Sequence, residues 1–357
     1  MRNIKLLGLL FTVCTMFFFL SCNTPTQSEL PTLSFQNLLS DNAPSVCQEK
    51  IEVLSVIPLE TSETVLLADI MKIVVADDLL FILDTEYKLR QFDMQGRFIR
   101  EIGREGQGPE EYTMLADFTI NSDRNEVYVS SMLKVVVYDY EGVFKRNIDL
   151  EDDNLQVLTY SNDNLFFIFP DKSYPESVNS ATLVTVLDLD GNIQKEYPAQ
   201  KMRRVGDFPF FNNIATDGAS VYYKEEMGQT LYAIREDFSV DSLAVLDMGR
   251  YAFQPEDFEF SKQEVWKERY RLQNILPTDD FMVFILQKGL MGEEFEPFLW
   301  KRSDNSVCRF DYKVTHQGND LLVMPKAVAD NKLIGVLASP ENEVESDNPV
   351  VVVLRIN

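Results

Sequence analysis

The segment from Gly103 to Tyr112, GREGQGPEEY, contains residue types that could do chemistry. Glycine-rich turns can present backbone N–H groups to an anion, which would suit a phosphate group. The segment lacks the Lys-Ser/Thr pair of a nucleotide-binding loop, and its three carboxylates would repel phosphate. We therefore interpret it mainly as a connection between structural units. In the alternative interpretation it lies near the mouth of a channel, where Arg104 and Glu105 meet a ligand.

The single histidine, His316, limits the enzyme classes that fit the sequence. A Ser-His-Asp hydrolase needs only one histidine, and Asp320 is close in sequence, but no Gly-x-Ser-x-Gly nucleophile elbow is present. The surrounding HQGND segment predicts a loop instead. One histidine also excludes a zinc centre with several histidine ligands, together with the lyase chemistry that such a centre supports.

Carboxylate pairs leave calcium as a metal that the sequence could bind, because calcium needs only oxygen ligands. The pairs are Asp77-Asp78, Asp152-Asp153 and Asp279-Asp280, and no Asp-x-Asp-x-Asp-Gly loop is present. The first and last pairs precede equivalent apolar strands, so we interpret them as turns in which Asp bonds its own backbone. We name no metal ligand and keep calcium as an alternative cofactor.

A further motif is the aromatic segment GDFPFFNN, which contains Phe210 and Phe211. Pro209 places this segment in a loop, and exposed aromatic side chains mark interfaces. We therefore name Phe210 and Phe211, with Arg104 and Glu105, as candidate ligand-binding residues. Packing of the aromatic rings between structural units is the favoured alternative, and no residue is named as catalytic.

A repeated unit must position these residues, and it is most complete between Asp77 and Tyr112. An acidic turn precedes an apolar strand, Leu79 to Leu83, and a glycine turn reverses the chain after a second strand. The first part of this unit recurs, which is typical of repeat architectures. The six copies are Asp77-Asp78 before LLFILD, Arg124-Asn125 before EVYVSS, Asp163-Asn164 before LFFIFP, Asp217-Gly218 before ASVYYK, Asp279-Asp280 before FMVFIL, and Asp330-Asn331 before KLIGVLA.

The glycine turn also repeats, with Gly96, Gly142 and Gly191 at intervals of 46 and 49 residues. These intervals suit the four-stranded blades of a propeller. A strand at Ile51 to Leu59 precedes the first complete blade, and the last blade ends after a third strand, Val350 to Ile356. Pairing these two strands would close the ring and protect two sheet edges. The sequence therefore predicts an all-β, six-bladed β-propeller whose N-terminal strand joins the last blade.

One interval of the repeat is longer than the others. Between blades four and five, Gln254 to Ile275 begins with Pro255 and Glu256, which can start a helix, and its apolar residues have a partly helical spacing. We predict a helical insertion on one face. Its favoured role is to pack over the junction between the two blades, with partner recognition as the alternative.

The N-terminus has the pattern of a secretory signal, in which Arg2 and Lys5 precede an apolar run from Leu6 to Leu20. This run is too short to predict a membrane-spanning helix. Phe19 to Cys22 resembles a bacterial lipoprotein signal, in which the cysteine becomes the lipidated first residue, and an ordinary signal peptide cut elsewhere is the alternative. We assign residues 1–21 to the signal, residues 22–44 to a polar flexible tether, and residues 45–357 to the propeller.

Composition limits the partners and the redox chemistry. Without Arg2 and Lys5, 31 basic and 57 acidic residues remain, a formal charge of −26, so we expect no nucleic-acid partner. Apart from Cys22, the mature chain would contain Cys47 and Cys308. An oxidising envelope permits a bridge between them, but two cysteines so far apart in sequence do not define a disulfide framework. Free buried thiols are the equal alternative.

Several motifs together carry a family resemblance. Ile57 to Thr61 (IPLET), Phe92 to Gly103, and Gly106 to Tyr112 followed by Asp117-Phe118 resemble the six-bladed β-propeller lipoproteins of the Gram-negative envelope, a family related to NHL-repeat propellers. The resemblance covers about Ile51 to Asn357 and is strongest in the first two blades. It implies a fold and an extracytoplasmic address, but fold alone assigns no reaction.

Our leading hypothesis is a monomeric scaffold, anchored in the outer membrane only by lipid, that binds an envelope protein or glycan and catalyses nothing. No acidic run follows Cys22, which favours the periplasmic side over the cell surface. The alternative is a calcium-assisted hydrolase or lyase that acts on a carbohydrate or lactone in the channel. Three or more Asp, Glu or Asn side chains at a channel mouth would favour the enzyme, whereas aromatic residues and isolated charges would favour binding.

Overall fold

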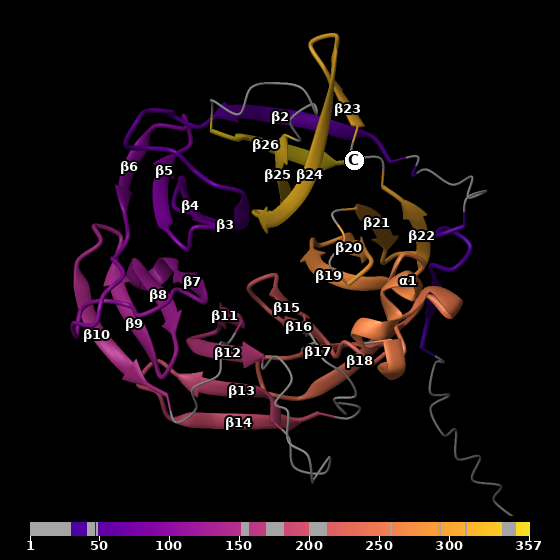
Figure 1. The fold of residues 1–357 in the computed structure, drawn as a ribbon, viewed down its shortest axis with the longest axis horizontal. Helices are drawn as coiled ribbons and strands as arrows, with labels where there is room; N and C mark the ends of the chain where they lie inside the picture. The colour runs from indigo at the N-terminus through magenta and orange to yellow at the C-terminus, as the bar shows by residue number, and fades with distance from the viewer. Residues whose placement is uncertain are drawn as a thin grey trace, which may run out of the picture.

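Six sheets surround a central axis in the computed structural model of this protein (Figure 1). The predicted all-β, six-bladed β-propeller is thereby confirmed. In each blade the first strand lies next to the axis and the last strand lies at the outer rim (Figure 1). The structure describes residues 30–40, 47, 49–150, 157–168, 182–199, 213–257, 259–290, 292, 294–310, 313–337 and 348–357.

The first three blades each contain four antiparallel strands in chain order from the axis to the rim. Blade 1 comprises β3 (Ile70–Ala76), β4 (Leu79–Asp84), β5 (Leu89–Asp93) and β6 (Phe98–Glu101). Blade 2 comprises β7 (Asp117–Asn121), β8 (Glu126–Ser131), β9 (Lys134–Asp139) and β10 (Phe144–Asp149). Blade 3 comprises β11 (Val157–Ser161), β12 (Asn164–Ile168), β13 (Thr182–Asp188) and β14 (Ile193–Pro198).

Two of the last three blades, blades 4 and 6, include a strand from the N-terminal part of the chain. Blade 4 comprises β15 (Asn213–Thr216), β16 (Val221–Lys224), β17 (Thr230–Ile234), β18 (Val240–Asp247) and β1 (Thr32–Ser34). Blade 5 comprises β19 (Tyr270–Pro277), β20 (Phe281–Lys288), β21 (Phe295–Lys301) and β22 (Ser306–Arg309). Blade 6 comprises β24 (Asn319–Ala329), β25 (Lys332–Leu337), β26 (Val350–Ile356) and β2 (Ile51–Pro58), with β23 (Lys313–His316) added to the start of β24.

The acidic turns that revealed the repeat join the first two strands of the blades. Asp77 and Asp78 have φ angles of 50° and 59°, and Asp330 and Asn331 have φ angles of 48° and 60°. Two consecutive residues with positive φ make the type I′ turn that matches the twist of a two-stranded ribbon. Asp and Asn tolerate this conformation better than most residues, which explains their recurrence at these positions.

Apolar side chains of adjacent blades pack against each other to form the core. Between blades 1 and 2, for example, Phe81 and Leu83 contact a cluster that includes Phe118 and Val129, and all four side chains are buried. Similar clusters lie at the other blade interfaces. Because each sheet is covered on both sides by its neighbours, the second strands are buried along most of their length rather than alternating between buried and exposed residues.

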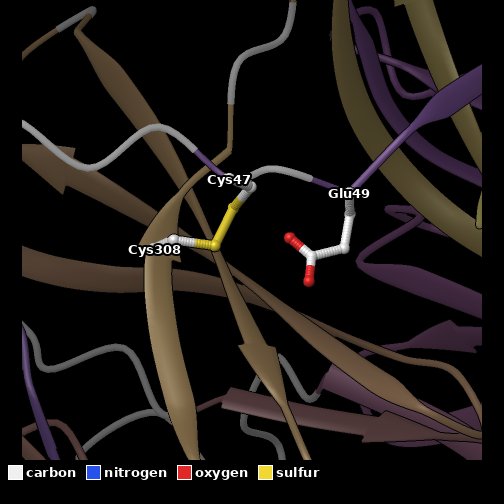
Figure 2. A group of neighbouring side chains, drawn as sticks. All are labelled: Cys47, Glu49 and Cys308. Carbon is white, nitrogen blue, oxygen red and sulfur yellow. A yellow bond between two sulfur atoms is a disulfide. The ribbon is translucent and has the colours of Figure 1, made fainter.

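The ring closes between the two ends of the propeller sequence. Strand β2 pairs antiparallel with β26, with Ile57 opposite Val351, as the orphan strand predicted. A disulfide between Cys47 and Cys308 also fastens the chain just before β2 to β22 of blade 5 (Figure 2). The pairing that the sequence left open is therefore present, and closure has a covalent as well as a hydrogen-bonded component.

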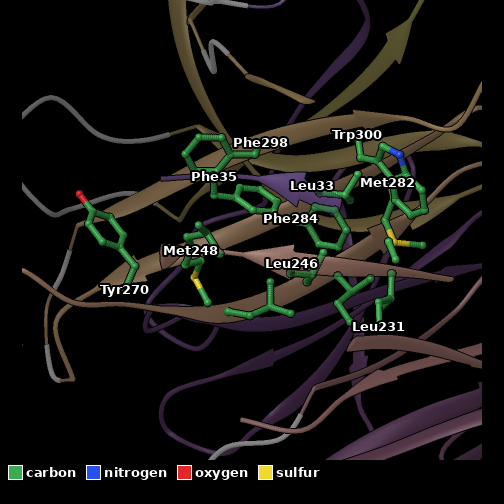
Figure 3. Close-up of a cluster of buried hydrophobic side chains, with 14 of the residues drawn as sticks. Leu33, Phe35, Leu231, Leu246, Met248, Tyr270, Met282, Phe284, Phe298 and Trp300 are labelled. Atoms are coloured by element: carbon green, nitrogen blue, oxygen red, sulfur yellow. The ribbon is translucent and has the colours of Figure 1, made fainter. Parts of the chain in front are cut away.

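The predicted tether, residues 22–44, is wrong for residues 30–40. Strand β1 pairs in parallel with β18, and Leu33 and Phe35 are almost fully buried. The Phe35 ring meets Phe284 and Phe298 edge-on, with centroids 5.8 and 5.4 Å away (Figure 3). The polar composition of the segment concealed these few apolar residues, which supply most of its packing.

The insertion between blades 4 and 5 consists of 3₁₀ turns and one short helix, α1 (Gln263–Trp266). Trp266 donates its indole N–H to the Asp257 carbonyl at 2.5 Å and packs with Phe253 and Leu290. The predicted helical insertion is therefore present, but its expected end at Ile275 is wrong, because β19 begins at Tyr270. The described part of the chain contains no helix with the length and apolar character needed to cross a bilayer.

Candidate functional site

The two ends of the ring carry connections of very different length. At one end, which we call the short-turn face, two to four residues join the first and second strands of every blade. At the other end, which we call the long-connection face, the second strands end and the chain arrives from the preceding blade. These connections include 102–116 and 248–269, the longest in the propeller. Binding residues commonly occupy such loops on a rigid scaffold, so the long-connection face is the candidate site.

A charged group bridges three blades at the axis on this face. Lys72 of β3 donates to both carboxylate oxygens of Asp117, on β7, at 2.9 and 3.0 Å, and to the Leu158 carbonyl, on β11, at 3.1 Å. Asp117 in turn accepts a hydrogen bond from the Leu158 backbone N–H at 2.8 Å. The Lys72 side chain remains 30% exposed. This arrangement is an isolated ion pair with a partly accessible cation rather than a convergence of carboxylates.

Irregularities in three inner strands shape the rest of the axis. The pairing register shifts around Met71 in β3, Gln273 in β19 and Lys326 in β24. Such bulges redirect a side chain out of the regular alternation and are common near functional sites. Burial lowers the pKa of Lys326, while the negative charge of Asp69 opposes that shift. Blades 5, 6 and 1 thus place an amide, a cationic and an apolar side chain, respectively, at these bulges.

Buried charges also lie where blade 4 meets blade 5. Lys224 is fully buried at the end of β16, and its ammonium donates to the Glu225 and Glu226 carbonyls at 2.8 and 3.1 Å. Burial lowers the pKa of Lys224 to about 8, against the opposing charges of Glu226 and Glu225. Arg271 of β19 lies 3.6 Å from the Glu226 carboxylate. Because the ammonium binds two backbone carbonyls, we assign Lys224 to holding the turn after β16.

Large apolar side chains are exposed on the same face. Tyr87, in the turn after β4, is 48% exposed, and Met132 and Leu133, in the turn after β8, are 40% and 51% exposed. Tyr87 and Met132 also have positive φ angles, 61° and 48°. This conformation is uncommon and costly for bulky residues, and retained strain of this kind clusters at functional sites. Two neighbouring blades therefore present apolar groups in backbone positions that Gly or Asn would occupy more easily.

The GREGQGPEEY segment folds back on itself and attaches to blade 2. Arg104 forms an ion pair with Glu111 at 2.7 Å, and a short parallel bridge joins Glu105 to Tyr112. Tyr138 and Lys134 of β9 donate to carbonyls of this loop at 2.8 Å each. These contacts fit the favoured interpretation as a connection between blades. Its anchors lie on an outer strand, so the structure does not bring Arg104 or Glu105 together with Lys72 at the axis.

The other predicted residues lie elsewhere. Cys22, Phe210 and Phe211 are outside the described residues, as is the Asp152-Asp153 pair. Asp77-Asp78 and Asp279-Asp280 lie on the short-turn face, away from the candidate site. His316 ends β23, and a two-residue turn of Gln317 and Gly318 connects it to β24, so the HQGND segment is a β-hairpin turn rather than an open loop.

One group of potential metal ligands was found among the described residues. It contains Cys47, Glu49 and Cys308, whose ligand atoms lie within 4.8 Å of one another (Figure 2). The two sulfurs are bonded to each other and thiolates are the form that binds metal, so the group does not fit a metal ion in this state. Calcium therefore stays an expectation from the sequence. A cavity of about 20 Å³ between blades 5 and 6, beside Thr278 and Asn331, has room for one water molecule.

Sequence reasoning missed the group formed by Lys72, Asp117 and Leu158. These residues belong to three blades and are separated by up to 86 positions. No local motif marks them, because the ring alone brings them together. The repeat did contain one usable signal, since Lys72 and Asp117 hold equivalent positions, each four residues before the end of the first strand of its blade.

Comparisons with known proteins agree with this architecture. The model of the family described as “Domain of unknown function (DUF4934)” matches residues 30–355. A candidate exported protein from Bacteroides fragilis NCTC 9343 has a similar solved structure, with 16% identity and a TM-score of 0.64 over 86% of this chain and 95% of that one. A member of the DUF4221 family from Bacteroides vulgatus ATCC 8482 has 11% identity and a TM-score of 0.60 over 87% and 98%. No curated protein matches the sequence.

Proposed function

The chain belongs to the family described as “Domain of unknown function (DUF4934)”, and because that description carries no activity, we propose a function from the geometry. The protein is a lipid-anchored envelope scaffold, and its long-connection face binds a protein partner. The observation that carries this proposal is the asymmetry of the ring. The longest connections between the described strands reach one face, while turns of two to five residues form the other.

The exposed side chains indicate the chemistry of the partner. Tyr87, Met132 and Leu133 supply apolar surface on blades 1 and 2. The strained backbone at Tyr87 and Met132 supports a functional origin, because Gly or Asn at either position would tolerate the positive φ angle better and stabilise the fold. Aromatic and methionine side chains are enriched at protein interfaces, and short turns on a rigid ring hold them with little loss of entropy on binding.

Charges around these residues favour a basic partner segment. Asp69, Glu105 and Glu110 are exposed and make no ion pair within the described residues. Two neighbouring cations are already neutralised, since Lys88 pairs with Glu86 and Arg104 pairs with Glu111, and the ammonium of Lys134 is held by the Glu111 carbonyl. A partner segment that carries both apolar and cationic side chains therefore complements this surface. The strongly acidic composition of the whole chain acts in the same direction.

An envelope address supports the same proposal. The sequence Phe19 to Cys22 resembles a lipoprotein signal, and one structural relative is a candidate exported protein. The Cys47–Cys308 disulfide is of the kind that persists in oxidising compartments. We place the protein at the outer membrane, facing the periplasm, with lipid on Cys22 as its membrane attachment.

Site-specific photocrosslinking tests the proposed face. A benzophenone amino acid replaces Tyr87 or Leu133 on the long-connection face, and Asp78 or Asp123 in matched turns of the same two blades. Tyr87 and Asp78 are a close pair, since their φ angles are 61° and 59°. We expect one protein to be crosslinked in living cells at both long-connection positions and at neither control. Equal adducts at both faces, or adducts at the controls alone, would contradict the proposal.

A glycan ligand is a distinguishable outcome of the same experiment. Adducts that resist protease and disappear after glycosidase treatment would identify a carbohydrate, and they would overturn the protein partner while keeping the face. Mass spectrometry of the tryptic digest makes this distinction directly. The absence of any adduct at Tyr87 and Leu133 would overturn both the partner and the face.

A further inference from the structure

The N-terminal segment wraps around the rim of half the ring. It begins as β1 on the outer edge of blade 4, and Phe35 then enters the apolar cluster shared with blade 5 (Figure 3). Arg309 of β22 donates to the Leu38 carbonyl at 2.6 Å, and the Cys47–Cys308 bond fixes the chain to the same strand. The segment ends as β2, the outermost strand of blade 6. We call the described residues of this segment, 30–40, 47 and 49–58, the rim strap.

The rim strap determines where a lipid anchor would hold the ring. Residues 30–40 are packed rather than extended away from the propeller, so only seven residues lie between Cys22 and Leu30, which are eight Cα-to-Cα steps apart. A chain of that length spans at most about 28 Å, even when fully extended. Because β1 lies at the outer edge of blade 4, the rim of that blade must stay near the membrane surface. Blade 1, three blades further around the ring, is on the opposite side (Figure 1).

The charges of the short-turn face oppose its contact with an anionic membrane. The turns between first and second strands contain eight acidic residues and one basic residue, Arg124. At physiological ionic strength, salt screens charge repulsion beyond about 8 Å, so acidic turns and anionic lipid headgroups repel each other when they come within that distance. The acidic residues of these turns are Asp77, Asp78, Asp123, Asp163, Asp217, Asp279, Asp280 and Asp330. The turns between third and fourth strands in blades 1 to 5 lie on the same face and add five acidic and three basic residues, so the turns of this face contain thirteen acidic and four basic residues.

From the position of β1 and these charges, we infer that the lipid anchor holds the propeller edge-on, with the rim of blade 4 toward the membrane and blade 1 away from it. This inference rests on the lipid anchor at Cys22 that the proposed function includes. Neither face then lies against the bilayer. The long-connection face opens sideways, so a partner reaches it from the aqueous space without leaving or entering the membrane.

Fluorescence quenching from the membrane tests this orientation. The acylated, oxidised protein is bound to vesicles of phosphatidylethanolamine and phosphatidylglycerol that carry a nitroxide quencher on the headgroup. Single thiol labels are placed at the rims through Ser242→Cys on blade 4 and Ile99→Cys on blade 1. A second pair on blade 2, Leu133→Cys and Asp123→Cys, compares the two faces. All four positions are exposed.

We expect the Ser242 label to be quenched at least threefold more than the Ile99 label, and the two blade 2 labels to agree within twofold. Equal quenching at the two rims, or strong quenching of one face label alone, would overturn the edge-on orientation. Flotation of the vesicles distinguishes a wrong orientation from a missing anchor. A protein that does not float with the vesicles lacks the lipid attachment, and this result would overturn both the anchor at Cys22 and the edge-on orientation. The photocrosslinking result is independent of either outcome.

Discussion

Removal of the Cys47–Cys308 disulfide is the perturbation whose effect the structure defines best. The bond joins residues 261 positions apart, so it closes almost the entire propeller sequence into one covalent loop. In the chain-entropy model a loop of this length lowers the entropy of the unfolded state by an amount worth about 5–6 kcal/mol at 25 °C. Residual structure in the unfolded chain reduces such values, so we expect Cys47→Ser with Cys308→Ser to lose about 3–5 kcal/mol.

The native contacts around the bond predict that the ring stays closed in this variant. Strand β2 keeps its pairing with β26, and Phe35 keeps its place between the rings of blade 5. The loss should therefore appear as a lower midpoint of urea unfolding without a change in the folded spectrum. Trp300 reports the transition, because it lies in the same apolar cluster as Phe35 and pairs with Val307, next to Cys308.

Two controls separate the disulfide from other effects of the substitution. Wild-type protein unfolded in the presence of reductant should match the double variant, since both lack the crosslink. Alkylation of the unfolded, unreduced wild-type protein should label neither Cys47 nor Cys308. The reasoning would be refuted if the free energies of unfolding of the oxidised wild type and the double variant differed by less than about 0.5 kcal/mol. In that case the closed loop would contribute almost nothing to stability.

Three further predictions follow from the packing, the charge and the strain. Phe35→Ala should cost about 3–5 kcal/mol in thermal unfolding, whereas Leu30→Ala, which changes a side chain that is 40% exposed, should cost less than about 1 kcal/mol. Folding lowers the pKa of Lys224 to about 8, so between pH 8 and pH 9.5 the unfolded chain binds more protons than the folded one. The stability of the wild type should therefore rise over this range relative to that of Lys224→Met. A difference in urea midpoint that stays constant with pH would contradict this prediction. Tyr87→Asn should gain about 1 kcal/mol of stability by relieving a positive φ angle while reducing partner crosslinking at Leu133, and a loss of stability would contradict the strain argument.

The fold was predictable because its information is local and repeated. Three of the acidic turns, at Asp77-Asp78, Asn162-Asp163 and Asp330-Asn331, have the two positive φ angles of a type I′ reversal. Six polar turns at similar spacing leave few architectures other than a propeller. The end strands, Ile51–Pro58 and Val350–Ile356, added an independent constraint, since each needed a partner. The disulfide could not be decided from sequence, because only the closed ring brings Cys47 and Cys308 to a Cα separation of 5.1 Å.

The rim strap and the site show where this reasoning ends. Leu33 and Phe35 lie in a polar segment, and nothing local indicates that the edge of blade 4 is available to pair with them. The glycine-rich segment at Gly103 was recognised as a connection, but its attachment to Tyr138 depends on the neighbouring blade. Candidate residues on the long-connection face are likewise defined by exposure and backbone strain, and neither property can be read from residue type.

The most direct test of the central claim is the affinity of the crosslinked partner for two matched surface variants. One variant combines Tyr87→Asp with Leu133→Asp on the long-connection face, and the other combines Asp78→Lys with Asp123→Lys on the short-turn face. Titration of each purified protein with the partner gives the dissociation constants. We predict at least a tenfold weaker Kd for the first variant and less than a twofold change for the second. Wild-type affinity in the first variant, or a greater loss of affinity in the second variant than in the first, would contradict the assignment of binding to the long-connection face.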